Sequence, residues 1–134
     1  MKDKIIGLFL LLLAIVIAES CQSNPYKQGE ALYTNFCASC HQAGGKSFEK
    51  LMPPLAQSDY LTEHKADLAC IIRYGLEGEI TVNGKKYNAV MGELPSLKEV
   101  EITNIINYIN NSWGNNNGYT PLKEVQKSLE NCDK

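Results

Sequence analysis

The chain has 134 residues and a formal net charge of −2, with 13 lysines and arginines against 15 aspartates and glutamates. This charge balance argues against binding to nucleic acid, which requires lysine and arginine clustered on one face. A chain of this length forms one small domain, and the hydrophobic core that it can build on its own is modest.

The first 20 residues have the pattern of a signal peptide. Lys2 and Lys4 form a short basic region before an apolar run from Ile5 to Ala18. This run is shorter than the roughly 20 residues that a membrane-spanning helix needs. The sequence therefore predicts export from the cytoplasm and removal of residues 1–20.

Two kinds of processing fit the end of this run. Ala18-Glu19-Ser20 is acceptable to ordinary signal peptidase, and Cys21 stands where a bacterial lipoprotein carries its lipid. The lipoprotein pattern is imperfect, because Ala18 and Glu19 replace the usual branched apolar and small residues. We expect a lipid on Cys21, with residues 21–24 as a tether; the alternative is a soluble exported protein.

The first helix of the mature chain is predicted to begin with Asn24 as its cap and Pro25 at the first helical position. We expect it to extend through the next motif and to end at Gly44-Gly45. Its apolar and small residues recur at helical spacing and would share one face: Tyr26, Gly29, Tyr33 and Phe36 or Cys37.

The most informative motif is Cys37-Ala38-Ser39-Cys40-His41. Two thiols at this spacing can each add across a vinyl group of haem, and the histidine that follows becomes an axial ligand of the iron. The motif predicts covalent haem c, held by Cys37 and Cys40 and ligated by His41. A thiol-redox or zinc site is the alternative, but no βαβ pattern and no second ligand pair accompany the motif.

The middle of the chain is predicted to hold a short helix and a hairpin. Residues 65–74 form the helix, closed by Gly75. Asn83-Gly84 between two short alternating runs indicates a two-residue hairpin turn. The expected helix face is Leu68, Ile71 and Ile72, and the expected cross-strand pairs are Ile80 with Tyr87 and Val82 with Lys85.

The last long helix has the clearest pattern. Ser96 and Glu99 have the spacing of a capping box, and Gly114 is expected to stop the helix. A smaller terminal helix is predicted over residues 119–132. The apolar stripe of the long helix follows 3.6-residue spacing: Ile102, Ile105, Ile106, Ile109 and Trp113.

A low-spin haem iron needs a second axial ligand, and methionine sulfur is a common partner of histidine in electron-transfer sites. Met91 follows the hairpin in a loop that is long enough to reach the opposite haem face, so we predict it as this ligand. Met52 is assigned to packing, and His64 to the surface.

Several of these features occur together in one known family. They cover roughly residues 25–114: Gly29, Tyr33 and Cys37 as Gly-x3-aromatic-x3-Cys, the Cys-x-x-Cys-His motif, Pro53 to Leu55, the methionine loop, and a final helix with Tyr108. In these features the chain resembles the class I c-type cytochromes.

The resemblance implies an all-α cytochrome c fold, with about four to five helices around one covalently bound haem and a small β-hairpin before the methionine-ligand loop. The domain would span residues 25–134. The first and last helices would cross where Gly29 approaches Tyr108. The backbone carbonyl of Pro53 would accept the Nδ1 hydrogen of His41 and fix the orientation of its ring.

More narrowly, the hairpin, the methionine loop and the ending Asn-Ser-Trp-Gly-Asn resemble bacterial monohaem cytochromes. This implies a periplasmic, membrane-anchored electron carrier whose partners are a dehydrogenase, a terminal oxidase or another cytochrome. Two departures are Gly92, where many relatives have proline after the ligand, and Gln57, where glycine is usual. Gly92 implies a looser ligand loop.

Two further expectations concern single residues. Arg73 and Tyr87 could each contact a haem propionate, against the alternatives of a solvated arginine and a packed tyrosine. Cys70 and Cys132 could form a disulfide in an oxidising compartment, or Cys70 could be a small core residue. The alternative function for the whole chain is a haem-based gas sensor or enzyme with a displaceable distal methionine.

Overall fold

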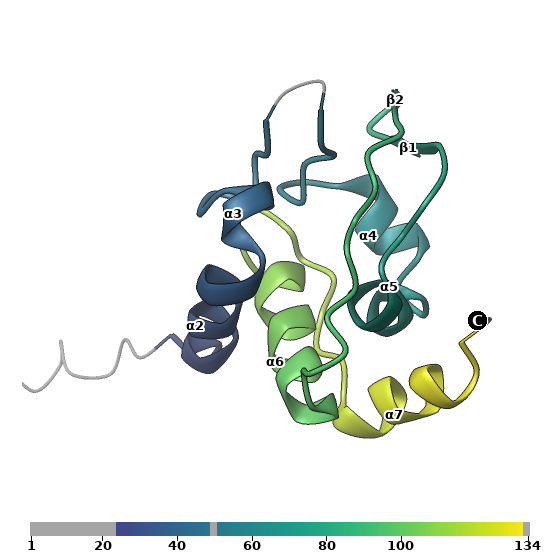
Figure 1. Ribbon diagram of the computed structural model, residues 1–134. Helices are drawn as coiled ribbons and strands as arrows, with labels where there is room; N and C mark the ends of the chain where they lie inside the picture. Colours follow the sequence, from purple (N-terminus) through teal and green to yellow (C-terminus); the bar gives the residue numbers. More distant parts are fainter. Residues whose placement is uncertain (1–23, 49–50, 133–134) are drawn as a thin grey trace, which may run out of the picture.

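The computed structural model describes residues 24–48 and 51–132; the predicted signal peptide and Cys21 lie outside these ranges. The predicted all-α fold with one small hairpin is confirmed (Figure 1). Six helices and two strands occur in the described residues: α2 (Lys27–Phe36), α3 (Ala38–His41), α4 (Asp59–Glu63), α5 (Leu68–Tyr74), β1 (Ile80–Val82), β2 (Lys85–Tyr87), α6 (Glu99–Asn110) and α7 (Leu122–Glu130).

The first helix is divided differently from its sequence pattern. It begins at Lys27, and Asn24 instead accepts the backbone N–H of Tyr26 through its side chain at 2.9 Å. Cys37 ends α2 and begins the one-turn helix α3. The helix count is therefore six within the described residues, because α3 and the short α4 stand as separate elements.

Helices α2 and α6 cross at Gly29. A Cβ atom placed on Gly29 would lie 2.1 Å from the backbone oxygen of Asn104 and 2.7 Å from the Cβ of Tyr108. Only glycine permits so close an approach of two helix backbones. The predicted approach of Gly29 to the Tyr108 region is confirmed.

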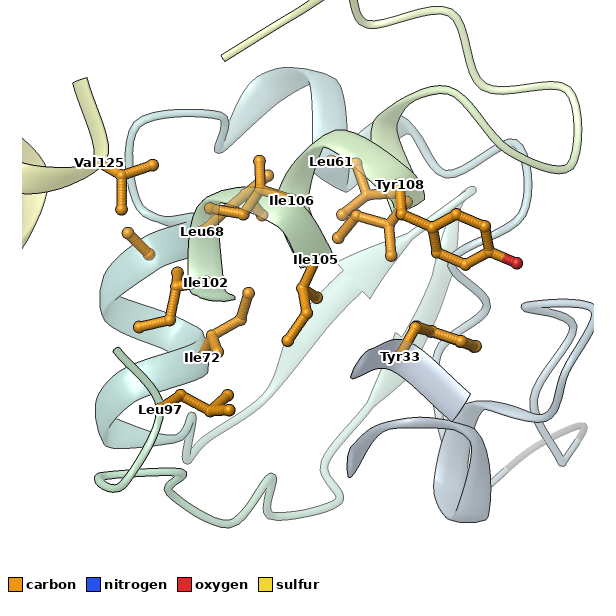
Figure 2. Packing of buried hydrophobic residues seen from close by; sticks show 12 residues of the cluster. Tyr33, Leu61, Leu68, Ile72, Leu97, Ile102, Ile105, Ile106, Tyr108 and Val125 are labelled. Carbon is orange, nitrogen blue, oxygen red and sulfur yellow. The ribbon is translucent and has the colours of Figure 1, made fainter. Parts of the chain in front are cut away.

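The core lies between α6 and the helices on either side of it. Figure 2 shows Ile102, Ile105 and Ile106 of α6 between side chains of α5 and those of Tyr33 and Tyr108. The predicted α6 stripe is buried, from Ile102 to Ile109. Trp113 lies beyond the helix end, with a positive φ of 54°, and packs on Tyr33 and Tyr108 at 4.9 and 5.2 Å between ring centroids.

The predicted capping box at Ser96 is wrong. The N-cap of α6 is Lys98, whose backbone N–H donates to the carboxylate of Glu101 at 2.7 Å. Helix α5 also begins later than predicted, at Leu68, and ends as predicted at Gly75, which has a φ of 81°. No helix within residues 24–48 and 51–132 is long and apolar enough to span a membrane.

The hairpin has the predicted register. Ile80 pairs with Tyr87 and Val82 pairs with Lys85. Asn83 and Gly84 both have positive φ, at 50° and 72°, as a two-residue hairpin turn requires. This register sets where the chain leaves the hairpin, at Tyr87, and enters the loop that holds Met91.

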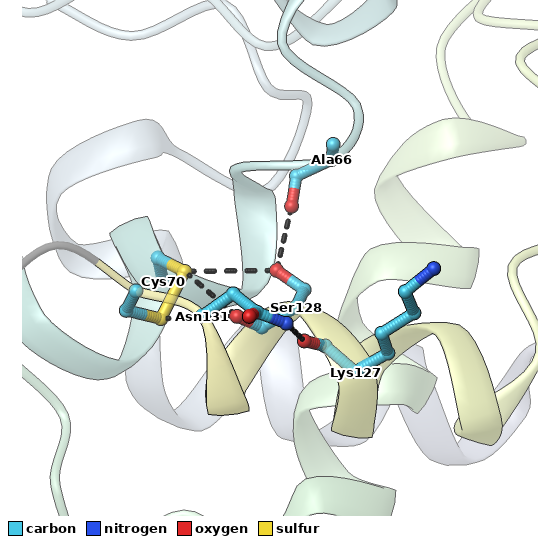
Figure 3. The surroundings of a disulfide bond; sticks show 6 residues. Ala66, Cys70, Lys127, Ser128 and Asn131 are labelled. Carbon is cyan, nitrogen blue, oxygen red and sulfur yellow. Dashed lines mark hydrogen bonds between the residues drawn. A yellow bond between two sulfur atoms is a disulfide. The ribbon is translucent and has the colours of Figure 1, made fainter.

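Helix α7 is fastened to α5 by a disulfide between Cys70 and Cys132. The bond lies beside Ser128, whose hydroxyl donates to the carbonyl of Ala66 at 2.6 Å (Figure 3). Val125 of α7 is buried in the main core. The open alternative for Cys70 is thereby resolved: it is bonded to Cys132.

Replacing Gly29 with alanine will destabilise the protein. In a helix interior, alanine is more favourable than glycine by about 1 kcal/mol. Forcing a methyl group against the α6 backbone, however, typically costs about 1–3 kcal/mol. We expect the free energy of unfolding in denaturant to fall by the difference between the two effects, up to about 2 kcal/mol. Gly44→Ala is the matched control, because a Cβ there meets nothing within 4 Å; equal stability of the two variants would contradict the crossing.

Removing the disulfide will also destabilise the protein. The bond closes a segment with a sequence separation of 62 residues, and a disulfide of this kind typically contributes about 2–4 kcal/mol. Cys70→Ser with Cys132→Ser should lower the unfolding free energy by that amount. Reduced wild-type protein should match the double variant, and a wild type that is insensitive to reductant would show that the bond does not stabilise the fold.

Candidate haem site

The Cys37 and Cys40 thiols lie at the junction of α2 and α3. The backbone N–H groups of Cys40 and His41 both donate to the carbonyl of Cys37, at 3.2 and 2.9 Å. This tight turn keeps Cys37 half-buried while Cys40 is exposed, and neither thiol is in a disulfide. Burial, and then the nearby Cys40, raise the pKa of the Cys37 thiol to about 11. Cys37 is therefore a neutral thiol at neutral pH in the chain without haem.

His41 is held by the loop that contains Ser47 and Pro53. Burial lowers the pKa of its imidazole, and a hydrogen bond with the backbone carbonyl of Pro53 acts in the opposite direction. The Oγ of Ser47 lies 3.4 Å from Nδ1 of His41 and donates to the Pro53 oxygen at 2.7 Å. With Nδ1 engaged here, Nε2 is the nitrogen left for a metal.

Ser47 was missed by the sequence analysis. It is 5% exposed, has a φ of 58°, and its backbone N–H donates to the carbonyl of His41 at 3.2 Å. Its position depends on a loop with left-handed backbone, which a serine in the sequence does not signal. In the sequence, Ser47 is marked only by its place midway between His41 and Pro53.

Met91 is fixed through its backbone. It forms an isolated antiparallel bridge with Leu76, in which each residue accepts the other's N–H at 3.0 and 2.9 Å. A Cβ on Gly75 would lie 2.4 Å from the Met91 carbonyl oxygen. The glycine that closes α5 therefore allows the methionine loop to lie directly against the helix end, despite Gly92 in place of proline.

His41 and Met91 face the same space. Two adjoining cavities share six lining residues: Cys37, His41, Pro53, Leu76, Ile80 and Met91. The first, here called the core cavity, extends among apolar residues of α4, α5, the hairpin and α6. The second, the edge cavity, reaches the surface at Phe36, Cys40 and Val90.

The residues around these cavities fit a covalently bound haem. A nitrogen donor and a sulfur donor line them, and two free thiols stand at the rim. Of the residues that the structure describes, His41 is the only histidine, lysine, arginine, aspartate or glutamate that lines the core cavity. The apolar walls would exclude water from the iron and contact the macrocycle of a bound haem. A histidine and a methionine are also the ligand types that raise the potential of haem iron.

A third cavity, of about 720 Å³, adjoins the other two and is here called the lysine cavity. It shares Pro54 with the core cavity and Met52 with the edge cavity. Tyr87 lines it and is buried. Met52 is half-buried at the boundary, consistent with packing, although it also borders the edge cavity.

Arg73 lies elsewhere. Its guanidinium donates to the carbonyl of Pro95 at 3.0 Å, and it lines none of the three cavities. Its neighbour Ile72 faces the core, and consecutive helix residues point about 100° apart. This position argues against the expected contact of Arg73 with a propionate. His64 stacks on Tyr60 and pairs with Asp67, as expected of a surface residue.

Comparisons with known proteins show which family the chain belongs to. The family model for cytochrome c matches residues 26–113. A cytochrome c-552 of Thermus thermophilus is 34% identical over 128 residues, which cover 89% of this chain and 81% of that protein. A second Thermus thermophilus protein of the same name is 36% identical over 108 residues, covering 74% of this chain and 82% of that protein.

A more distant relative is the cytochrome c subunit of alcohol dehydrogenase (quinone) from Gluconobacter oxydans. It is 28% identical over 101 residues, which cover 74% of this chain but only 21% of that subunit. Family membership excludes the thiol-redox and zinc alternatives for the Cys-x-x-Cys pair. The chain belongs to the cytochrome c family: it is a class I c-type cytochrome, an electron-transfer protein with covalently bound haem c rather than an enzyme.

Proposed function

We propose that this chain is a monohaem electron carrier whose iron is ligated by His41 and Met91 and whose haem is attached through Cys37 and Cys40. The observation that carries the proposal is that His41 and Met91 line the same two cavities, with both thiols at their rim. Bound haem supplies an iron that exchanges single electrons. The chain orients its ligands and keeps water away from it.

The two ligands are held in complementary ways. His41 is oriented through Nδ1 by Pro53 and Ser47, and Met91 is positioned by its bridge to Leu76. Neither arrangement depends on the haem, so both donors are in place before and after each electron transfer. A site that is held in this way keeps reorganisation on redox change small.

Electrons enter and leave at the edge cavity. Cys40 is exposed there, beside Phe36 and Val90, which are 42% and 66% exposed. A small apolar contact around an exposed cofactor edge suits brief encounters with redox partners. A dehydrogenase is one such partner, since a relative is the cytochrome subunit of a dehydrogenase; a terminal oxidase or another cytochrome is the other class.

The carrier works in the periplasm and is anchored by a lipid on Cys21. Residues 1–20 direct export, and residues 21–24 form the tether before the domain at 25–134, whose core is 25–114. Tethering raises the effective concentration of the domain at a membrane-bound partner.

Met91→Ala will remove the sulfur ligand. The oxidised wild-type protein should show the near-infrared sulfur-to-iron absorption band, and Met91→Ala should lose it and bind carbon monoxide rapidly when reduced. Met52→Ala is the matched control, because Met52 borders only the edge cavity and the lysine cavity, and it should keep the band. A wild type without the band, or one that binds carbon monoxide rapidly, would favour the gas-sensor alternative.

Cys21→Ser will release the protein from the membrane. Expressed with its leader and haem-maturation machinery, the wild type should fractionate with membranes and carry an acyl mass on its first residue. The variant should appear in the soluble periplasmic fraction with the same absorption spectrum. Wild-type protein that is already soluble and unacylated would contradict the lipid anchor and leave the electron-carrier proposal intact.

A further inference from the structure

The lysine cavity carries a positive charge that is not balanced within the described residues. Its lining includes Lys46, Lys85 and Lys86. Lys86 pairs with Glu79 at 2.7 Å. Within residues 24–48 and 51–132, Lys46 and Lys85 form no salt bridge. Two unpaired cations therefore stand beside the haem cavities, next to the buried Tyr87.

The remaining lining is suited to a planar group with polar ends. Gln57 and Trp113 contribute an amide and an indole ring, and Pro54 and Ala56 are apolar. Part of this wall is fixed by close packing, since a Cβ on Gly45 would lie 2.5 Å from the Trp113 ring. The lining of the cavity thus combines apolar residues with cations and hydrogen-bonding groups.

Among residues 24–48 and 51–132, acidic side chains near the haem cavities are placed away from this cavity or are already engaged. Glu93 is the only acidic residue in those ranges that lines the edge cavity. Glu79 is neutralised by Lys86. Asp59 accepts the backbone N–H groups of Tyr60 and Asn83 at the hairpin tip. An anionic group at the haem periphery is therefore repelled at the Glu93 side and attracted at the lysine cavity.

Haem itself brings two anionic groups. Its propionates are attached to the edge of the macrocycle opposite the two vinyl groups. If Cys37 and Cys40 bind the vinyl groups, the carboxylates face across the cavities from the α2–α3 junction. The core cavity offers them no cation, and burying an unpaired carboxylate is very costly. The lysine cavity adjoins both haem cavities and supplies the missing charge.

We propose that Lys46, Lys85 and Tyr87 bind the haem propionates in the lysine cavity. The lysines balance the two carboxylates, and the Tyr87 hydroxyl, which forms no hydrogen bond within the described residues, donates to one of them. This inference rests on the proposed attachment at Cys37 and Cys40. It replaces Arg73 with the two lysines and retains Tyr87 from the sequence-based expectation.

The test is the pH dependence of the reduction potential in the holoprotein. Paired cations favour ionised propionates and hold their pKa down. In Lys46→Gln with Lys85→Gln, the potential should fall at neutral pH, because positive charge near the iron favours the ferrous state. The pH at which the propionates change the potential should rise by about one unit. Tyr87→Phe should shift the profile in the same direction by less.

Two control variants separate this proposal from a general charge effect. Lys123→Gln removes an exposed lysine on α7, which lies at the opposite end of the molecule from the hairpin (Figure 1), and should leave the profile unchanged. Arg73→Gln should also leave it unchanged. A shift with Arg73→Gln but not with the lysine variant would overturn the proposal, as would a lower potential with an unmoved pH profile.

The near-infrared band reports on the proposed function separately. It should persist in the lysine and tyrosine variants, because none of these residues lines the two cavities that His41 and Met91 line. If the wild type lacks the band, the His41 and Met91 ligation fails. If the band persists but the pH profiles of all variants coincide, only the propionate site fails.

Discussion

The rest of the structure depends on the close crossing of α2 over α6 at Gly29. Gly29, Tyr33 and Cys37 are spaced four residues apart, so they share one face of the helix. Gly29 brings the backbone of α2 against Asn104, and one turn later Tyr33 packs against Tyr108 with tilted rings, at 5.4 Å between ring centroids. The next turn presents Cys37 to the core cavity. A packing constraint at one glycine thus determines where the haem-attachment motif meets the domain.

The two expected iron ligands depend on this frame through different elements. His41 follows Cys37 within one helical turn and is oriented by the loop that contains Ser47 and Pro53. Met91 is held where the end of α5 and the loop after the hairpin exchange two backbone hydrogen bonds. Backbone groups therefore help to position both donors: the Pro53 carbonyl for His41 and the Leu76 bridge for Met91.

The features predicted correctly from the sequence depend on short-range geometry. Asn83-Gly84 determines the hairpin register, and the apolar spacing of α6 determines its buried face. The incorrect or missing predictions concern positions where two local arrangements compete, or where the outcome depends on tertiary structure. Glu101 reaches back to Lys98 in place of the Ser96–Glu99 pair. The contact of Ser47 with His41 depends on a left-handed loop residue, which the sequence pattern does not specify.

The hydrophobic core and the haem cavities are built from the same residues. Ile72, Ile105 and Ile109 belong to the main apolar cluster and also line the core cavity, so each packs against protein and would also contact a bound haem. A domain of this size buries too little apolar surface to be stabilised strongly by its own side chains. The charged periphery of the haem would have no place in that core. The core cavity suits the apolar macrocycle of haem. The lysines of the adjoining cavity suit its anionic propionates.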